Sequence, residues 1–489
     1  MKSHLDYLRE RGFEVASVGQ DVTVFPLENL TPSLRLWINL HRSELLAELA
    51  AGDGIARHCV WRVYLRGEDV TIDGKAYRAG LWYHGQERKG AARTVEPVDQ
   101  WVSIPLHIEA ETLDENGYTG RLLRFTNRGR PVRWVLPMGM LATHGGNVLK
   151  ALFRQGFTAD HQGHRQVLTY LREHPRPERL IQIATKPGWH DSGVFVLPGK
   201  PIGAADVYLD ASRQQASLYH RRGTLDGWRQ SVGLGCLGDP ALELAVCLAL
   251  AGPLLDALGV PGGGVHLLGG TDSSAPLAVR VAASVWGDPF DLTASWHSTQ
   301  AALIQEAIQR NNTVLPLNGG DWPDLNAEKL GDAIARGRLD IYRHGSCSTL
   351  AWRVLMLSHG RRRLFSDART DWPLVDIATD RPAQAARLDV GHALETHYGH
   401  LGPAFVESLL ACGGPDTLVP MFHEVRKRLL EVETPHVWRV ADRFAAMAVA
   451  GEHAIACELL DWSRGKALET CHRLYEQWRT TRKRPASRR

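Results

Sequence analysis

One stretch of this 489-residue chain constrains its fold more than any other, because an apolar run ends there at a glycine and leads into a helix. Residues 265–268, Val-His-Leu-Leu, are typical of a short buried parallel strand. Gly269 ends this run, and residues 277–285 then have the Ala, Val and Leu content of a helix. A strand joined to a helix through a glycine loop is the repeating unit of an α/β sheet.

Two later apolar runs extend this pattern. Residues 313–317 are followed by Asn318 and Gly319, and residues 352–358 end at the polar Ser358. Strands that alternate with helices predict an α/β fold, and such sheets hold their functional site at the carboxyl ends of the strands.

The loop after the first strand has the spacing of a phosphate-binding loop but lacks its functional residues. The motif reads G-x-x-x-x-G-K-[ST], in which the lysine contacts phosphate and the hydroxyl holds Mg²⁺. Here Ser274, Ala275 and Pro276 stand in place of the second glycine, the lysine and the hydroxyl residue. Proline also removes a backbone N–H beneath the phosphate. The residues left for a vestigial nucleotide site are Gly269, Gly270, Thr271, Asp272, Ser273 and Ser274.

Several phrases, spread from about residue 65 to about residue 480, carry a family resemblance. They include Gly188-Trp189-His190, Gly263-Gly264-Val265-His266, Asn311-Asn312 and Leu374-Val375-Asp376-Ile377. The chain resembles the helicase-like AAA+ proteins long labelled as a domain of unknown function, which prophages, plasmids and cassette elements encode. The resemblance implies an AAA+ P-loop-type core that assembles into rings, binds ATP between subunits and acts on DNA during replication of a mobile element.

Compared with that family, this chain differs at the positions of functional residues and keeps the motifs that support the fold. The family's phosphate, metal, water and arginine positions correspond to Ala275, Pro276, Asn318, Gly319, Arg361 and Pro373. A basic segment of the family corresponds to residues 337–342, where Asp340 and Tyr342 replace its two basic residues. We therefore expect no catalytic residues and no cofactor, and a fold that is retained without ATP hydrolysis.

Three functions are compatible with this pattern. The first is a catalytically degenerate scaffold, adaptor or DNA-binding partner in replication. The second is an active DNA-dependent ATPase with an unorthodox nucleotide site, which would need ATP and Mg²⁺. The third is a phage-defence or regulatory component built on the same fold, since fold alone does not fix function.

Positive charge is concentrated locally, because the whole chain carries a net charge of only +3. Two clusters could bind nucleic-acid phosphates, although a solvated charged tail is the commoner role for the second. They consist of Arg361, Arg362 and Arg363, and of Arg482, Lys483 and Arg484.

Seven cysteines without a C-x-x-C spacing argue against a disulfide framework and against a metal site. Cys247, Cys412 and Cys457 lie in apolar helical segments, which predicts buried thiols. The longest apolar stretch, residues 241–260, is interrupted by Glu243, Pro253 and Asp256. We therefore expect a cytoplasmic protein without a membrane segment.

Residues 1–50 predict a separate small module, with a helix over 4–11, a hairpin over 13–25 and a second helix that opens at Thr31-Pro32. This segment resembles the small docking domain of nonribosomal peptide synthetase subunits, and the resemblance implies a protein partner. The alternative is a lobe that packs on the next domain.

The remaining chain predicts three domains. Residues 55–235 favour an α+β accessory domain, with strands at 77–83, 101–108 and 121–125 and helices at 147–155 and 165–174. In it, Trp189 and His190 could stack on DNA bases, or be a buried Trp and a turn His. Residues 236–390 are the degenerate core, and residues 391–489 are helical, including segments at 439–451 and 452–462. A homo- or hetero-oligomer is expected.

Overall fold

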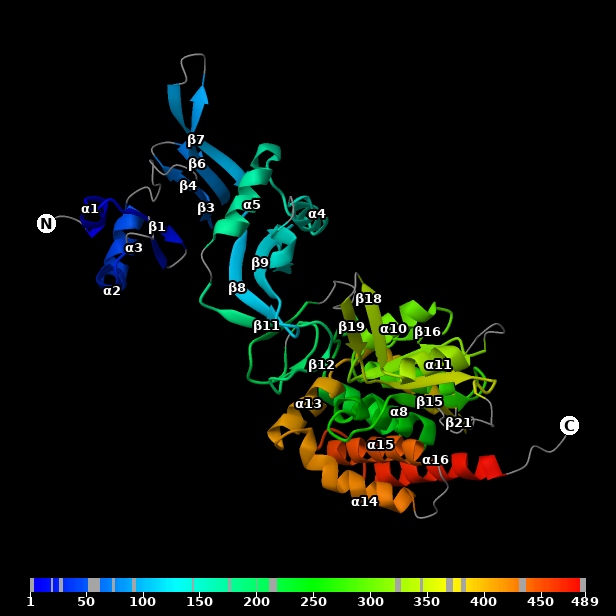
Figure 1. Ribbon diagram of the computed structural model, residues 1–489. Helices are drawn as coiled ribbons and strands as arrows, with labels where there is room; N and C mark the ends of the chain where they lie inside the picture. Colours follow the sequence, from blue (N-terminus) through cyan, green and yellow to red (C-terminus); the bar gives the residue numbers. More distant parts are fainter. Residues whose placement is uncertain are drawn as a thin grey trace. The chain divides into compact units, whose positions relative to one another are not determined.

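The structure is a computed structural model, and its chain divides into two compact units, Met1–Gln182 and Ile183–Arg489 (Figure 1). The boundary falls inside the predicted 55–235 domain, and the division into four domains remains a prediction. The structure describes residues 4–18, 21–25, 30–51, 62–72, 75–89, 94–142, 145–174, 177–199, 201–210, 218–321, 327–343, 346–365, 373–379, 384–430 and 437–483.

The first unit begins with a small α+β module. Its elements are α1 (His4–Arg9), β1 (Glu14–Val18), β2 (Asp21–Phe25), α2 (Pro32–Leu40) and α3 (Arg42–Ala51). The first helix and the hairpin were predicted, but the single second helix predicted from Thr31 was wrong, because it ends at the cap residue His41 and α3 follows. Thr31 caps α2, because its hydroxyl accepts a hydrogen bond from the Leu34 amide at 3.3 Å. Leu5, Leu8, Phe13, Val15, Val24, Ile38, Leu45 and Leu49 form the core of the module.

Antiparallel sheets make up the rest of the first unit. Strand β6 lies between β3 and β7, and β9 lies between β8 and β10. Helices α4 and α5 pack with both groups of strands into one apolar core. The strands are β3 (Arg62–Arg66), β4 (Val70–Ile72), β5 (Lys75–Tyr77), β6 (Gly80–Lys89), β7 (Thr94–Ser103), β8 (His107–Asp114), β9 (Thr119–Asn127), β10 (Arg130–Pro137) and β11 (Leu180–Ala184), and the helices are α4 (Gly146–Arg154) and α5 (His164–Glu173).

Two predicted strands of this unit were wrong as single elements. The run 77–83 breaks before Gly80, which has a φ of +150°. A Cβ at this position would lie 2.1 Å from the Ser103 carbonyl oxygen, so only glycine fits. The run 101–108 breaks at Ile104, whose amide donates to the Thr158 carbonyl at 3.0 Å, and at Pro105, which lacks an N–H. The alternation of apolar residues in the sequence gives no sign of either break.

The second unit is built on a five-stranded parallel sheet in the order β16-β17-β20-β15-β21. One face packs on α8 and α9, and the other packs on α10 and α11. The predicted α/β fold is therefore confirmed. The strands are β15 (Gly263–Leu268), β16 (Ala294–Ser295), β17 (Val314–Asn318), β20 (Leu355–Gly360) and β21 (Leu374–Ala378), and the helices are α8 (Pro240–Ala251), α9 (Ala275–Ser284), α10 (Gln300–Gln309) and α11 (Ala327–Ala335).

The second unit also contains smaller elements. They are the hairpin of β12 (Gly188–Trp189) and β13 (Phe195–Val196), the strand β14 (Val207–Leu209), the short helix α7 (Leu225–Trp228) and the hairpin of β18 (Arg338–Arg343) and β19 (Ser346–Ala351).

The carboxyl-terminal region is helical, as predicted, with α12 (Gln384–Thr396), α13 (Leu401–Ala411), α14 (Val419–Leu429), α15 (Trp438–Ala456) and α16 (Lys466–Lys483). Helices α15 and α16 run side by side at the red end of Figure 1, and α15 also packs on α8. The helix predicted over 452–462 was wrong, because α15 continues to Ala456 and the chain then turns through the left-handed Glu458. Among the described residues, no helix combines the length and apolarity that crossing a bilayer requires.

Candidate functional site

The loop that follows β15 is tied to both neighbouring strands at the carboxyl edge of the parallel sheet. The Gly269 amide donates to the Gly360 carbonyl at 2.9 Å, where β20 ends. On the other side, the amide and the hydroxyl of Thr379 both donate to the Leu268 carbonyl, at 2.9 and 3.0 Å. The predicted vestigial nucleotide loop therefore lies at the position where parallel α/β sheets bind ligands.

Inside this loop, the polar groups largely bond to one another. The buried Ser273 donates twice to the Gly270 carbonyl, from its amide at 3.0 Å and from its hydroxyl at 2.7 Å. The Ala275 amide donates to the Ser273 hydroxyl at 3.3 Å, and buried Ser274 bonds to the Asp239 carboxylate. Thr271 and Asp272 are exposed at the loop tip. The loop is thus a closed turn with internal hydrogen bonds.

The start of α9 offers no charged side chain to a phosphate. Ala275 is fully buried in the apolar core, and Pro276 occupies the first turn of the helix. Arg361 lies close to this loop, since a Cβ built on Gly270 would lie 3.5 Å from its Nε. An arginine from the end of β20 therefore flanks the loop in which the motif would carry a lysine.

The end of β17 contributes an exposed amide side chain from Asn318 and then a glycine, Gly319, with a φ of +81°. Beyond them, the Asp321 carboxylate accepts a hydrogen bond from the Arg361 amide. Sequence reasoning missed Asp321, although its position just after the Asn-Gly-Gly that ends the strand was a usable signal. The site thus holds the exposed carboxylate of Asp321 beside Arg361, in addition to that of Asp272 at the loop tip.

Buried below this edge is a polar network that the sequence did not predict. His266 of β15 and Ser358 of β20 are register partners, with 3.0 Å between Nδ1 and Oγ. The indole of Trp296 donates to the same Ser358 oxygen at 2.7 Å, and His266 Nε2 lies 3.0 Å from the Arg362 carbonyl. A carbonyl only accepts, so we assign the proton to Nε2, and the Ser358 hydroxyl then donates to Nδ1. Burial lowers the pKa of His266 to about 4, so the ring is neutral at pH 7.

The predicted basic residues differ in how they are presented. Arg361, Arg362 and Arg363 are all exposed directly after β20, at the same edge as the loop. Arg482 and Lys483 end α16, whereas Arg484 lies outside the described residues. The first cluster is therefore placed beside the candidate site.

Pro373, which stands in place of a family arginine, lies next to an arginine from elsewhere. Its carbonyl accepts from Arg443 Nη1 of α15 at 2.6 Å. Burial lowers the pKa of Arg443 to about 10, so the guanidinium stays charged at pH 7. Because Arg443 is buried in the fold, it supports β21 and does not present a cation to a ligand.

Trp189 is held within the fold. Its indole donates to the Pro253 carbonyl at 2.7 Å, and its ring packs edge-on against Phe195 at 5.1 Å. His190 forms a turn with Ser192, at 3.1 Å. These contacts favour the structural role over base stacking. In β18, the Asp340 carboxylate forms an ion pair with Arg338 of the same strand at 3.0 Å.

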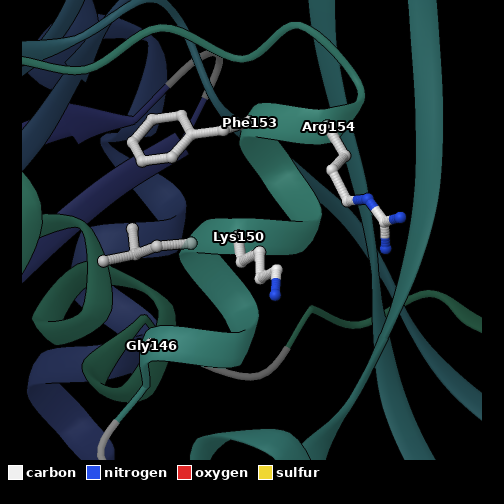
Figure 2. Close-up of a pocket in the computed structure, with 5 residues that line it drawn as sticks. Gly146, Lys150, Phe153 and Arg154 are labelled. Carbon is white, nitrogen blue, oxygen red and sulfur yellow. The ribbon is translucent and has the colours of Figure 1, made fainter.

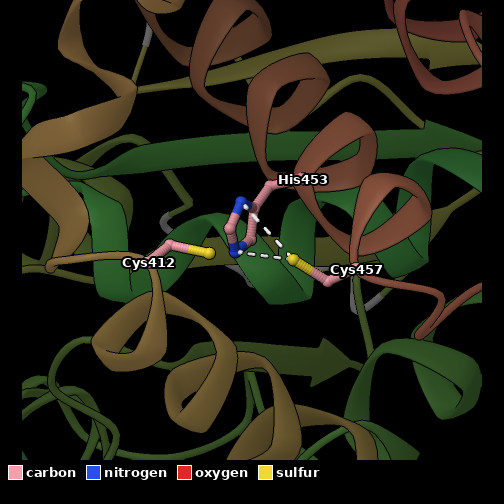
Figure 3. A group of neighbouring side chains, drawn as sticks. All are labelled: Cys412, His453 and Cys457. Atoms are coloured by element: carbon pink, nitrogen blue, oxygen red, sulfur yellow. Dashed lines mark hydrogen bonds between the residues drawn. The ribbon is translucent and has the colours of Figure 1, made fainter.

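Two further features lie outside the sheet edge. In the first unit, a pocket of about 530 Å³ runs along α4, lined by Gly146, Leu149, Lys150, Phe153 and Arg154 (Figure 2). In the second, Cys412, His453 and Cys457 come together (Figure 3). The predicted burial of Cys247 is confirmed, but that of Cys412 was wrong, because Cys412 follows the last turn of α13 and is exposed. Cys457 is only half-buried.

The chain belongs to the family described as Domain of unknown function (DUF927), whose model matches residues 74–321. Among solved structures, it is similar to "SCCmec type IV Cch - active helicase", with a TM-score of 0.63 and 17% sequence identity over 82% of this chain and 78% of that chain. No curated protein matches it. At this identity the likeness shows the fold alone, so it confirms the predicted α/β fold, and the family match confirms the predicted family labelled as a domain of unknown function.

Proposed function

We propose that this chain is a helicase-like protein of a mobile genetic element whose AAA+ P-loop-type core no longer hydrolyses ATP. It serves as a scaffold, adaptor or DNA-binding partner in replication. The observation that carries the proposal is the loop after β15, in which buried Ala275 and Pro276 open α9 where a phosphate-binding loop has its lysine and hydroxyl residue.

The surrounding groups support the loss of hydrolysis. Phosphoryl transfer needs cationic groups and metal ions that neutralise charge as it develops in the transition state. At the end of β17, Asn318 offers a neutral amide and Gly319 no side chain. On β20, the Ser358 hydroxyl is buried between His266 and Trp296, so it does not reach a bound nucleotide. The transition state for phosphoryl transfer would therefore lack several kcal/mol of electrostatic stabilisation at this site.

DNA contact is proposed through the three exposed arginines, Arg361, Arg362 and Arg363. They are adjacent in the chain and lie at one edge of the sheet, so they concentrate positive charge on a protein with little net charge. Contacts to backbone phosphates release counterions and are independent of base sequence. We therefore expect weak, sequence-independent binding that falls steeply with salt.

A protein partner is proposed through residues 1–50. Helix α2 exposes Leu36 and Leu40, at 70% and 74% of their surface, beside a module that has its own core. A chain that lacks residues 1–50 should melt at the same temperature as the full chain and lose a partner in pull-downs from the native host. Unfolding of the remainder would instead make this segment part of the larger fold.

A second function, ATP hydrolysis at an unorthodox site, is favoured by one observation. Arg361 flanks the loop and Asp321 lies next to it, so a cation and a carboxylate are present at the sheet edge. In that case phosphate release from ATP and Mg²⁺ would be measurable and Asp321→Asn would abolish it. The degenerate function predicts no release by the full chain, with or without DNA, and no effect of Asp321→Asn.

A further inference from the structure

Three side chains with metal-binding chemistry meet at the ends of two helices in the second unit. Cys412 follows the last residue of α13, and Cys457 follows the last residue of α15, one turn after His453. The ligand atoms of all three lie within 4.8 Å of one another. Figure 3 shows the imidazole between the two sulfur atoms.

The fold positions these groups through ordinary helix geometry. His453 and Cys457 are four residues apart, so they lie on one face of α15. Cys412 is fixed by its amide, which donates to the Ser408 carbonyl at 3.0 Å and closes the last turn of α13. His453 is buried, and its ring packs edge-on against Phe405 at 5.5 Å. The imidazole is thus held in place by packing before any ion binds.

The spacing suits a tetrahedral ion. Bonds of about 2.3 Å to sulfur and about 2.0 Å to nitrogen, at a tetrahedral angle, separate the two ligand atoms by about 3.5 Å. The distance between Cys457 Sγ and His453 Nε2 is 3.5 Å. Hydrogen bonding alone does not require this arrangement, because Nε2 already has the Ser408 hydroxyl as a partner at 3.1 Å.

We propose that Cys412, His453 and Cys457 bind a zinc ion. Two thiolates and an imidazole form the borderline-soft ligand set that zinc prefers. The Ser408 hydroxyl donates to the Phe405 carbonyl at 2.7 Å, so in the ion-free state His453 Nε2 carries the proton. On binding, that proton moves to Nδ1, and the two thiols release theirs to solvent.

The ion would join the end of α13 to the end of α15. Cys412 is exposed, so the ion can reach the site from solvent, and a water can complete the fourth position. An ion that binds the folded chain and not the unfolded chain stabilises the folded state by mass action. The site therefore adds a metal-dependent contribution to the stability of the helical region, independent of the sheet-edge loop.

Cobalt(II) titration of the full chain, kept reduced under an inert atmosphere, tests this site. Cobalt in a tetrahedral thiolate site gives visible ligand-field bands and a near-ultraviolet sulfur-to-metal band. We expect both to saturate at one ion per chain and to vanish when zinc is added. Zinc should also raise the melting temperature, and a chelator should reverse the rise.

Variants locate the ion. Cys412→Ser, Cys457→Ser and His453→Asn should each weaken binding by more than about 100-fold, because even outer-shell partners account for about 10- to 100-fold. Cys347→Ser and His472→Gln are matched controls and should bind normally. Cys412 is exposed, so Cys412→Ser should melt like the parent chain without metal. Three results would overturn the proposal: no cobalt bands, unchanged bands in Cys412→Ser, or a reduced chain that binds no metal and only forms a Cys412–Cys457 disulfide on oxidation.

Discussion

The Ser358 hydroxyl lies 3.0 Å from Nδ1 of His266, and both residues are fully buried on neighbouring central strands of the parallel sheet. Ser358 is thereby the hub of the network, because it also accepts from the Trp296 indole. In the low dielectric of the interior, removing such a hub leaves its partners unsatisfied.

We predict that Ser358→Ala destabilises the second unit by about 1–3 kcal/mol, since it leaves a buried donor on Trp296 and a buried acceptor on His266. Chemical denaturation measures the change in the free energy of unfolding. Ser298→Ala, at a half-buried serine near the same edge, is the control and should change it far less. Equal stability of the Ser358→Ala chain would mean that the network does not exist.

Stability should fall with acid through His266. Burial lowers the folded pKa of this ring to about 4, while the unfolded chain titrates near its ordinary value of about 6.5. The unfolded state therefore binds more protons between these values, so stability is complete above about pH 6.5 and declines towards about pH 4. Denaturation midpoints across this range should fall less steeply in His266→Asn than in the parent chain. Equal slopes would place the titration elsewhere.

Rebuilding the phosphate loop should restore nucleotide binding without turnover. The triple variant Ser274→Gly, Ala275→Lys and Pro276→Thr returns a cradle and a cation, while Asn318 and Gly319 stay as they are. ATP should then raise its melting temperature relative to the parent chain. Phosphate release by this variant would contradict the assignment of Asn318 and Gly319 to the family's metal and water positions.

Replacing Arg361, Arg362 and Arg363 by alanine should weaken DNA binding and flatten its salt dependence. Each phosphate that a cation no longer neutralises changes the log–log slope by about 0.9 on duplex DNA, so the triple variant should change it by about 2.7. Anisotropy titrations across a salt series measure both quantities. The control replaces three exposed cations of α14 and α15, namely Lys427, Arg428 and Arg439. Equal losses of DNA affinity in the two variants would mean that binding depends on the overall charge of the protein and not on these three arginines.

The parallel core was predictable because its strands are buried on both faces and read as apolar runs that end at Gly269, Asn318 and Ser358. Pro105 was a break signal that the sequence itself carries, whereas the break before Gly80 was missed because it depends on a contact with Ser103, far along the chain. Dependence on contacts far along the chain also hid the pairing of His266 with Ser358, whereas Asp321 could have been found from its position just after Asn318-Gly319-Gly320. The metal-binding potential of Cys412 and Cys457 was likewise missed, because Cys412 comes close to His453 and Cys457 only where α13 contacts α15.

Phosphate release from ATP by the full chain is the most direct test of the central claim. Purified protein is assayed with Mg²⁺, in the presence and absence of single- and double-stranded DNA, beside its Asp321→Asn variant. We predict that neither protein exceeds the background rate under any of these conditions. Enzyme turnover at its low end is about 1 per second. A DNA-stimulated rate of this size that is lost in Asp321→Asn would contradict the account and establish an ATPase with an unorthodox site.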